Sequence, residues 1–388
     1  MSQLYPLRSK PFKGMSAFQR ISEDTTPSQA AILLAFGNQI RGGDAPLRAR
    51  AAGRRRQRYV ASEPDSSAFP VPRLTGLSDP IPVEASRERL QKVHAYKAAR
   101  IAKPTADPVR YESIFRDAAQ RVFDKPQAVR AADLFAMCLE HPRELVRIAA
   151  AIASLPLTTR PQQNLRVLLE GLKSHDELER TLAATGLART YPDHPALARL
   201  SRGKTARRTR RPRETALLVH GTWASDHPWY QPGGGFFQYI QGLRPDLYDG
   251  ADFFRWGGGW SDGARLAGAT ALKQWVEQRN EGGLDLIGHS HGANVMLKAT
   301  ELGLQVGQAV LLSCPVHVDK YFPSFAHLQA PVRSVRVHFD LVILADGGAQ
   351  RFNHPDIKEL VLPIWFDHGA SHEARVWQDH NVAQKIGL

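Results

Sequence analysis

The sequence has little cysteine and no long hydrophobic run. Its 388 residues include only two cysteines, Cys138 and Cys314, which are too few for a disulfide framework and match no zinc-binding spacing. This scarcity favours a reducing compartment, and we expect a cytoplasmic protein. The longest apolar run near the start, residues 30–36, is far too short to span a bilayer and lacks the layout of a secretory signal. We therefore expect no transmembrane segment.

Negative charge is scarce in the first part of the chain and more plentiful in the second. Residues 1–213 hold 38 Lys and Arg against 20 Asp and Glu, a net charge of +18. Residues 214–388 hold 13 against 18, a net charge of −5, so the whole chain carries +13. This asymmetry indicates two modules with different roles.

Two basic segments of the first part show no pattern of regular structure. Residues 1–85 combine basic clusters with many prolines, which predicts a mostly disordered arm containing one short helix at 29–40. Residues 201–213 form an arginine-rich linker. The charge of residues 1–213 favours an anionic surface or a protein partner. The linker has no aromatic residues for base stacking, so a nucleic-acid partner is disfavoured.

Residues 86–200 have the 3.6-residue periodicity of a helical domain, with many Ala and Leu. The stretches 144–150 and 177–183 are similar and lie 33 residues apart. This spacing resembles a degenerate HEAT-type array, and a small helical bundle explains the pattern equally well. Helices are expected at 86–103, 108–123, 126–140, 143–154, 161–173, 176–191 and 195–200.

Residues 214–388 alternate strand and helix patterns, which predicts an α/β domain with a doubly wound, mostly parallel sheet. Functional groups are then expected at the carboxyl ends of the strands. Strands are expected at 216–219, 252–255, 284–287, 309–313, 334–339 and 359–365. Helices are expected at 263–278, 293–302 and 374–382.

The most informative motif is Gly-x-Ser-x-Gly around Ser290, between an apolar strand pattern and a helix pattern. This context is typical of a nucleophile elbow, where a strained turn exposes the serine and leaves no room for Cβ atoms at Gly288 and Gly292. The residue after the nucleophile, His291, is expected to donate its backbone N–H to an oxyanion. Although His289 and His291 flank the serine, no further ligands follow nearby, so we expect no metal and no cofactor.

A second motif, His220-Gly221-Thr222, ends the first strand pattern of this domain. Together with the motif at Ser290 and the stretch 254–261, it resembles the α/β-hydrolase superfamily, of the serine esterase and lipase kind, over residues 214–388. The resemblance implies an α/β-hydrolase fold with a minimal lid. It also implies that the Thr222 backbone N–H is the second oxyanion donor.

The resemblance places the acid and the base of a Ser-His-Asp triad after the serine in the chain. Asp340 follows the strand pattern 334–339 and is favoured as the acid over Asp346, which belongs to a turn signal. His372 matches the family's histidine loop and is favoured as the base over His368.

These residues predict a serine hydrolase that cleaves a small-molecule ester or lipid through an acyl-enzyme. The alternatives are acyl transfer or thioester cleavage by the same triad, and an inactive scaffold whose basic half binds anionic partners. Between the first two strand patterns lies an aromatic segment, which we interpret as a lid, an acyl-pocket wall or a helix packed on the sheet. Its aromatic residues are Trp223, Trp229, Tyr230, Phe236, Phe237 and Tyr239.

Overall fold

The structure is a computed structural model, and it describes residues 26–41, 71–77, 108–158, 161–200, 216–279 and 284–388. Two compact units can be distinguished. The first comprises Met1–Tyr191 with Leu344–Gly347 and Ile364–Phe366, and the second comprises Pro192–Ile343, Gly348–Pro363 and Asp367–Leu388. Of the predicted arm 1–85, the structure describes only residues 26–41 and 71–77. The helix predicted at 86–103 and the linker 201–213 also lie outside the described residues.

The first unit is built from helices, as the 3.6-residue periodicity predicts. Asp176 caps the helix that begins at Glu177 by accepting a hydrogen bond from the backbone N–H of Glu179, at 3.1 Å. The helices of this unit are α1 (Thr26–Arg41), α3 (Pro108–Asp124), α4 (Ala128–Cys138), α5 (Glu144–Ser154), η2 (Leu155–Leu157), α6 (Gln162–Gly171) and α7 (Glu177–Thr190). The short helix α8 (Pro195–Ala198) follows them in the chain and belongs to the second unit.

Helix α5 is the central helix of this unit and packs against α1, α4, α6 and α7. Its contact with α1 is close, because a Cβ on Gly37 would lie only 2.7 Å from the Cα of Ala153. Helix α1 is buried over most of its length, with Phe36 fully buried. The helix predicted at 29–40 is therefore part of the helical core, although it lies in the segment predicted to be a mostly disordered arm. Burial of its apolar residues against α5 explains why it folds despite its basic, proline-rich flanks.

The second unit holds the sheet, apart from the last two residues of β5. The sheet is five-stranded and parallel, and its spatial order follows the chain, β1-β2-β3-β4-β5. The strands are β1 (Ala216–Val219), β2 (Leu284–His289), β3 (Val306–Leu312), β4 (Val332–His338) and β5 (Ile357–Trp365). Because all strands run in one direction, the residues that follow them share one edge of the sheet.

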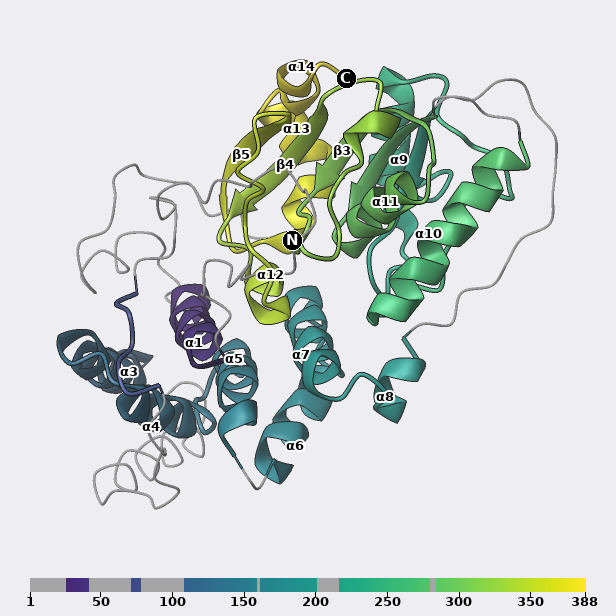
Figure 1. Cartoon of the computed structure of the whole chain (residues 1–388). Coiled ribbons are helices and arrows are strands. Elements are labelled where there is room, and N and C mark those ends of the chain that lie inside the picture. The colour runs from purple at the N-terminus through teal and green to yellow at the C-terminus, as the bar shows by residue number, and fades with distance from the viewer. Residues whose placement is uncertain (1–25, 42–70, 78–107, 159–160, 201–215, 280–283) are drawn as a thin grey trace, which may run out of the picture. The chain divides into compact units, whose positions relative to one another are not determined.

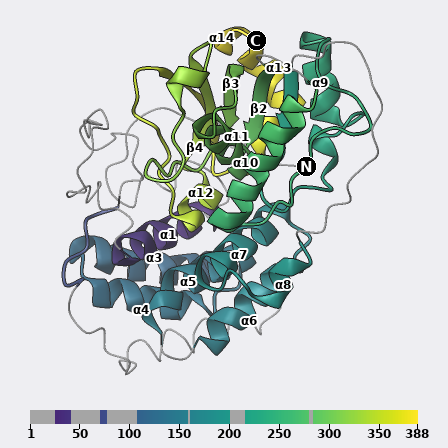
Figure 2. The same ribbon diagram turned by 45° about the vertical axis from the view of Figure 1, so that its right-hand side comes forward.

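Helices cover both faces of this sheet. Helices α10 (Asp262–Glu277) and α11 (His291–Glu301) lie together on one face, while α9 (Gly235–Leu243) and α13 (Ala374–Asp379) lie on the other (Figures 1 and 2). The chain ends with α14 (Val382–Ile386). No helix in the described part of the chain is long and apolar enough to cross a bilayer.

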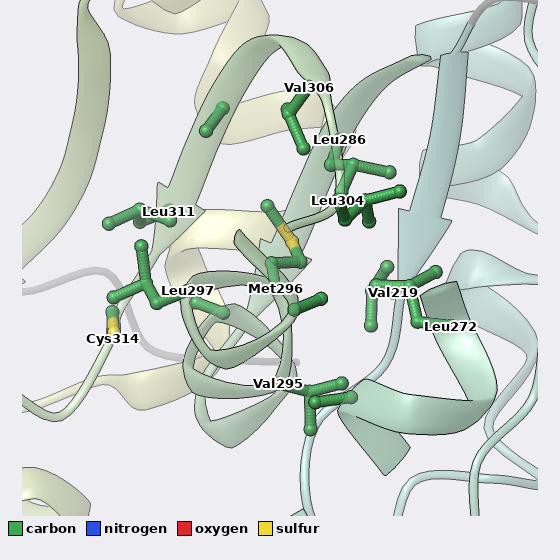
Figure 3. Packing of buried hydrophobic residues seen from close by; sticks show 14 of the residues in the cluster. Val219, Leu272, Leu286, Val295, Met296, Leu297, Leu304, Val306, Leu311 and Cys314 are labelled. Atoms are coloured by element: carbon green, nitrogen blue, oxygen red, sulfur yellow. The ribbon is translucent and has the colours of Figure 1, made fainter. Parts of the chain in front are cut away.

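The core beneath α10 and α11 consists of alternate strand residues and the inner faces of the two helices (Figure 3). Met296 of α11 lies at its centre, surrounded by Val219, Leu286 and Leu311 from three neighbouring strands. All four side chains are at most 1% exposed. Burial of this apolar surface fixes α11, and with it the residue that begins the helix, against the carboxyl ends of β1 and β2.

Five of the six predicted strands are present, but residues 252–255 form no strand. On the outer side of β1, Ala216 instead forms an isolated parallel bridge with Leu247. Downstream, backbone groups find other partners: the N–H of Phe253 donates to the carbonyl of Gly250 in a turn, at 3.0 Å. The apolar pattern at 252–255 therefore reflects burial in a turn and not pairing in the sheet.

Candidate functional site

Strained backbone conformations occur at the carboxyl ends of four strands of the sheet. The residue directly after each of β2, β3, β4 and β5 has a positive φ although it is not glycine. These residues are Ser290 (φ 53°), Ser313 (φ 43°), Phe339 (φ 50°) and Phe366 (φ 69°). Such conformations cost about 1–3 kcal/mol each and concentrate at functional sites.

Ser290 occupies the turn between β2 and α11, with φ 53° and ψ −132°. Its backbone N–H donates to the carbonyl of Leu312 at 2.8 Å, which ties the turn to β3. The flanking glycines are required by close approach. A Cβ on Gly292 would lie 2.2 Å from the carbonyl oxygen of His220, and one on Gly288 would lie 2.2 Å from the sulfur of Met296. The motif thus allows α11 to begin directly against the end of β1.

The His220-Gly221-Thr222 loop lies beside Ser290, since a Cβ on Gly221 would be 2.9 Å from the Ser290 Cβ. His220 is fully buried, and burial lowers its pKa to about 4. Its Nδ1–H donates to the carbonyl of Gly221 at 2.8 Å, while its Nε2 accepts from the Trp256 backbone N–H at 3.3 Å. The ring therefore fixes the loop. No backbone carbonyl within the described residues accepts from the backbone N–H of Thr222.

His291 begins α11, and neighbouring side chains engage its imidazole. Arg265, which is 2% exposed, donates from Nη2 to His291 Nε2 at 3.0 Å. The side-chain amide nitrogen of Asn294 lies 2.9 Å from Nδ1. Because Arg265 bonds Nε2 and Asn294 lies against Nδ1, the ring is engaged by these two side chains, and the group of His291 that lies next to Ser290 is its backbone.

Asp340 and His368 form a buried pair at the same edge. Asp340 follows β4 and is 0% exposed, and its Oδ2 accepts a hydrogen bond from His368 Nδ1 at 2.7 Å. Its Oδ1 accepts from the backbone N–H groups of Val342, at 2.9 Å, and Ile343, at 3.2 Å. These donors begin α12 (Leu341–Asp346) and hold the carboxylate in one orientation. The carboxylate in turn fixes the His368 tautomer with hydrogen on Nδ1 and a bare Nε2.

The histidine that bonds Asp340 is His368 and not His372, the residue that the resemblance to the family's histidine loop favoured as the base. Both belong to the 3-10 segment η5 (His368–His372), which Asp367 caps by accepting from the Gly369 N–H at 3.0 Å. Within it the two rings reach different partners. His372 stacks on Trp229 at 4.4 Å between ring centroids, with planes 6° apart. Burial, and the charge that His368 acquires when protonated, lower the His372 pKa to about 3.

His289 also lies at the site, although the sequence around it indicated neither a catalytic role nor a metal site. It ends β2, directly before Ser290, and its Nε2–H donates to the backbone carbonyl of His368 at 3.2 Å. Its ring centroid lies 4.6 Å from that of His368 and 4.2 Å from that of His372. The rings of three histidines thus lie together at the end of β2. Only the tertiary contact reveals this, because His289 is separated by 79 residues from its hydrogen-bond partner.

The alternative acid, Asp346, ends α12, where its charge raises the pKa of Arg189 and so opposes the effect of burial. In the aromatic segment, Phe236 and Phe237 are buried within α9, as expected for a helix packed on the sheet. Phe236 also packs edge-on against Trp377 of α13, at 5.3 Å. Within the described ranges, no group of three or more His, Cys, Asp and Glu side chains is arranged to hold a metal ion.

Comparisons with known proteins identify no family. No family model matches the chain, and no curated protein matches it. Three chains among the solved structures match. One, a crystal structure of an uncharacterized protein from Bacillus cereus ATCC 10987, is 12% identical, covers 70% of this chain and 91% of its own, and has a TM-score of 0.23.

Proposed function

We propose that residues 214–388 form a serine hydrolase of the α/β-hydrolase type that cleaves carboxylic esters, with Ser290 as nucleophile, His368 as base and Asp340 as acid. The observation that carries the proposal is the buried hydrogen bond between Asp340 and His368, at the sheet edge where Ser290 occupies its strained turn. A carboxylate that orients a histidine beside a serine is the arrangement that activates a hydroxyl as a nucleophile.

In this mechanism the Ser290 hydroxyl transfers its proton to His368 Nε2 while its oxygen bonds to the ester carbonyl carbon. The backbone N–H groups of Thr222 and His291 receive the negative oxygen, and each contributes about 3 kcal/mol to the transition state. The carbon–oxygen bond to the alcohol then breaks, and His368 returns the proton to the departing alcohol. Water repeats the sequence on the acyl-enzyme, releasing the acid and restoring Ser290. Throughout, Asp340 stabilises the transient imidazolium.

Covalent labelling tests the nucleophile. Wild type and Ser290→Ala are treated with a fluorophosphonate probe, and p-nitrophenyl butyrate hydrolysis is measured in parallel. The matched control is Ser313→Ala, because Ser313 is also buried and also follows a strand with positive φ. We expect wild type and the control to label and turn over, and Ser290→Ala to do neither. Equal labelling of Ser290→Ala and wild type would refute the assignment of the nucleophile.

A further inference from the structure

The backbone of His368 is fixed from the side of the nucleophile. The Nδ1–H of His368 is held by Asp340, but a ring held at one atom can still pivot about that bond. The second constraint is the bond from His289 Nε2–H to the His368 carbonyl, at 3.2 Å. Because His289 is bonded directly to Ser290 in the chain, this contact couples the serine's own strand to the segment that carries the histidine.

Packing holds the His289 ring in this orientation. It is 6% exposed and lies between other rings, at 4.6 Å from His368, 4.2 Å from His372 and 5.6 Å from Trp229. Burial, reinforced by the positive charges that His372 and His368 carry when protonated, holds its pKa well below the ordinary value. A neutral histidine that donates from Nε2 carries no proton on Nδ1, so its single N–H is committed to the His368 carbonyl.

We propose that His289 is a positioning residue for ester hydrolysis: its Nε2–H holds the His368 backbone at a fixed distance from Ser290, so that the His368 ring faces the hydroxyl. This inference rests on the proposed function, because it assigns His368 as the base. His289 itself touches neither substrate nor the transferred proton. Its contribution is geometric, and a displacement of about 1 Å at a reacting group lowers a rate by about 100-fold.

Substitutions that separate the hydrogen bond from the ring provide the test. His289→Gln keeps an amide donor at nearly the position of Nε2, whereas His289→Asn is also an amide but is one methylene too short to reach. His289→Phe keeps an aromatic ring without a donor. The matched control is His354→Phe, because His354 packs against Phe325 and Phe322 in an aromatic cluster outside the site, at 4.8 and 5.3 Å.

The measurements are the rate of fluorophosphonate labelling, kcat and KM for p-nitrophenyl butyrate, and the midpoint of thermal unfolding. We expect kcat and the labelling rate to fall about 10- to 100-fold in His289→Asn and His289→Phe, with KM changed less than about 3-fold. His289→Gln should recover most of the loss, and His354→Phe should match wild type. Folding is checked by the unfolding midpoint, and the Asn and Gln pair answers the question if His289→Phe does not fold.

Two results would overturn the inference while leaving the proposed function intact. One is wild-type kcat in His289→Asn or His289→Phe. The other is an equal loss in His289→Gln and His289→Asn, which would assign the effect to ring packing. If wild type itself is not labelled at Ser290, the proposed function fails and the positioning role fails with it.

Discussion

Replacing Asp340 with asparagine should change the tautomer of His368 without destabilising the fold. Asp340 is 0% exposed and accepts three hydrogen bonds, from Val342 N–H, Ile343 N–H and His368 Nδ1–H. In Asp340→Asn the amide oxygen still accepts from the two backbone donors, so α12 should begin as before. The amide NH₂ group, however, now faces Nδ1, and it can bond only if Nδ1 has no hydrogen. The His368 proton then moves to Nε2, which can no longer accept a proton from Ser290.

The expected loss in kcat is about 10⁴-fold, the magnitude typical of a triad histidine in the wrong tautomer, and it corresponds to about 5 kcal/mol of transition-state stabilisation. Stability should change little, with the unfolding midpoint within about 3 °C of wild type. Asp340→Ala should behave differently. It also leaves two buried backbone N–H groups without acceptors, at about 1–3 kcal/mol each, and should lower the midpoint by several degrees.

The assay is p-nitrophenyl butyrate hydrolysis at pH 8, with thermal unfolding followed by circular dichroism. Asp346→Asn is the matched control, since Asp346 is the other buried acid proposed from the sequence. We expect the control to keep kcat within a few-fold of wild type. A folded Asp340→Asn protein with kcat within tenfold of wild type would refute the reasoning. A large loss in Asp346→Asn alone would transfer the acid role to that residue.

Three further results are expected. His368→Ala should lower kcat by about 10³- to 10⁴-fold, whereas His372→Ala should lower it by less than about tenfold. If steady-state kinetics show the larger loss in His372→Ala, then His372 is the base. Gly292→Ala should destabilise the fold by about 3 kcal/mol, because its Cβ would lie 2.2 Å from the backbone oxygen of His220; urea unfolding that matches wild type would contradict this. Burial, with the charges of nearby acidic groups, raises the pKa of Asp367 to about 6, so its ionisation destabilises the fold as pH rises from about 4 to 6. Asp367→Asn should therefore gain about 2–3 kcal/mol over wild type between pH 4 and pH 7 in urea titrations, and a pH-independent difference would exclude this origin.

Local sequence determined most elements and the serine turn. Strand β1 and helices α5 and α7 lie within a residue or two of their predicted bounds, because buried strands and amphipathic helices carry their periodicity within one segment. The turn at Ser290 is similarly local: an apolar strand, two glycines and a helix pattern occupy about ten consecutive residues. Its strained φ follows from the motif itself.

Other features depend on contacts between distant residues, and these the sequence did not determine. Both His368 and His372 have suitable chemistry and chain order, so the sequence could not choose between them. In the structure Asp340 bonds His368, because η5 directs the two rings to different partners. Likewise, nothing near His289 in the chain indicates a bond to a carbonyl 79 residues away. The proline-rich sequence that flanks α1 predicted that this helix lies outside the helical domain. In the structure, its apolar residues are buried against α5. The sequence by itself determined which segments are strands and helices and where the serine turn lies. Only the tertiary structure decided which buried polar groups are partners, because a buried donor must bond whichever acceptor the packed chain brings to it.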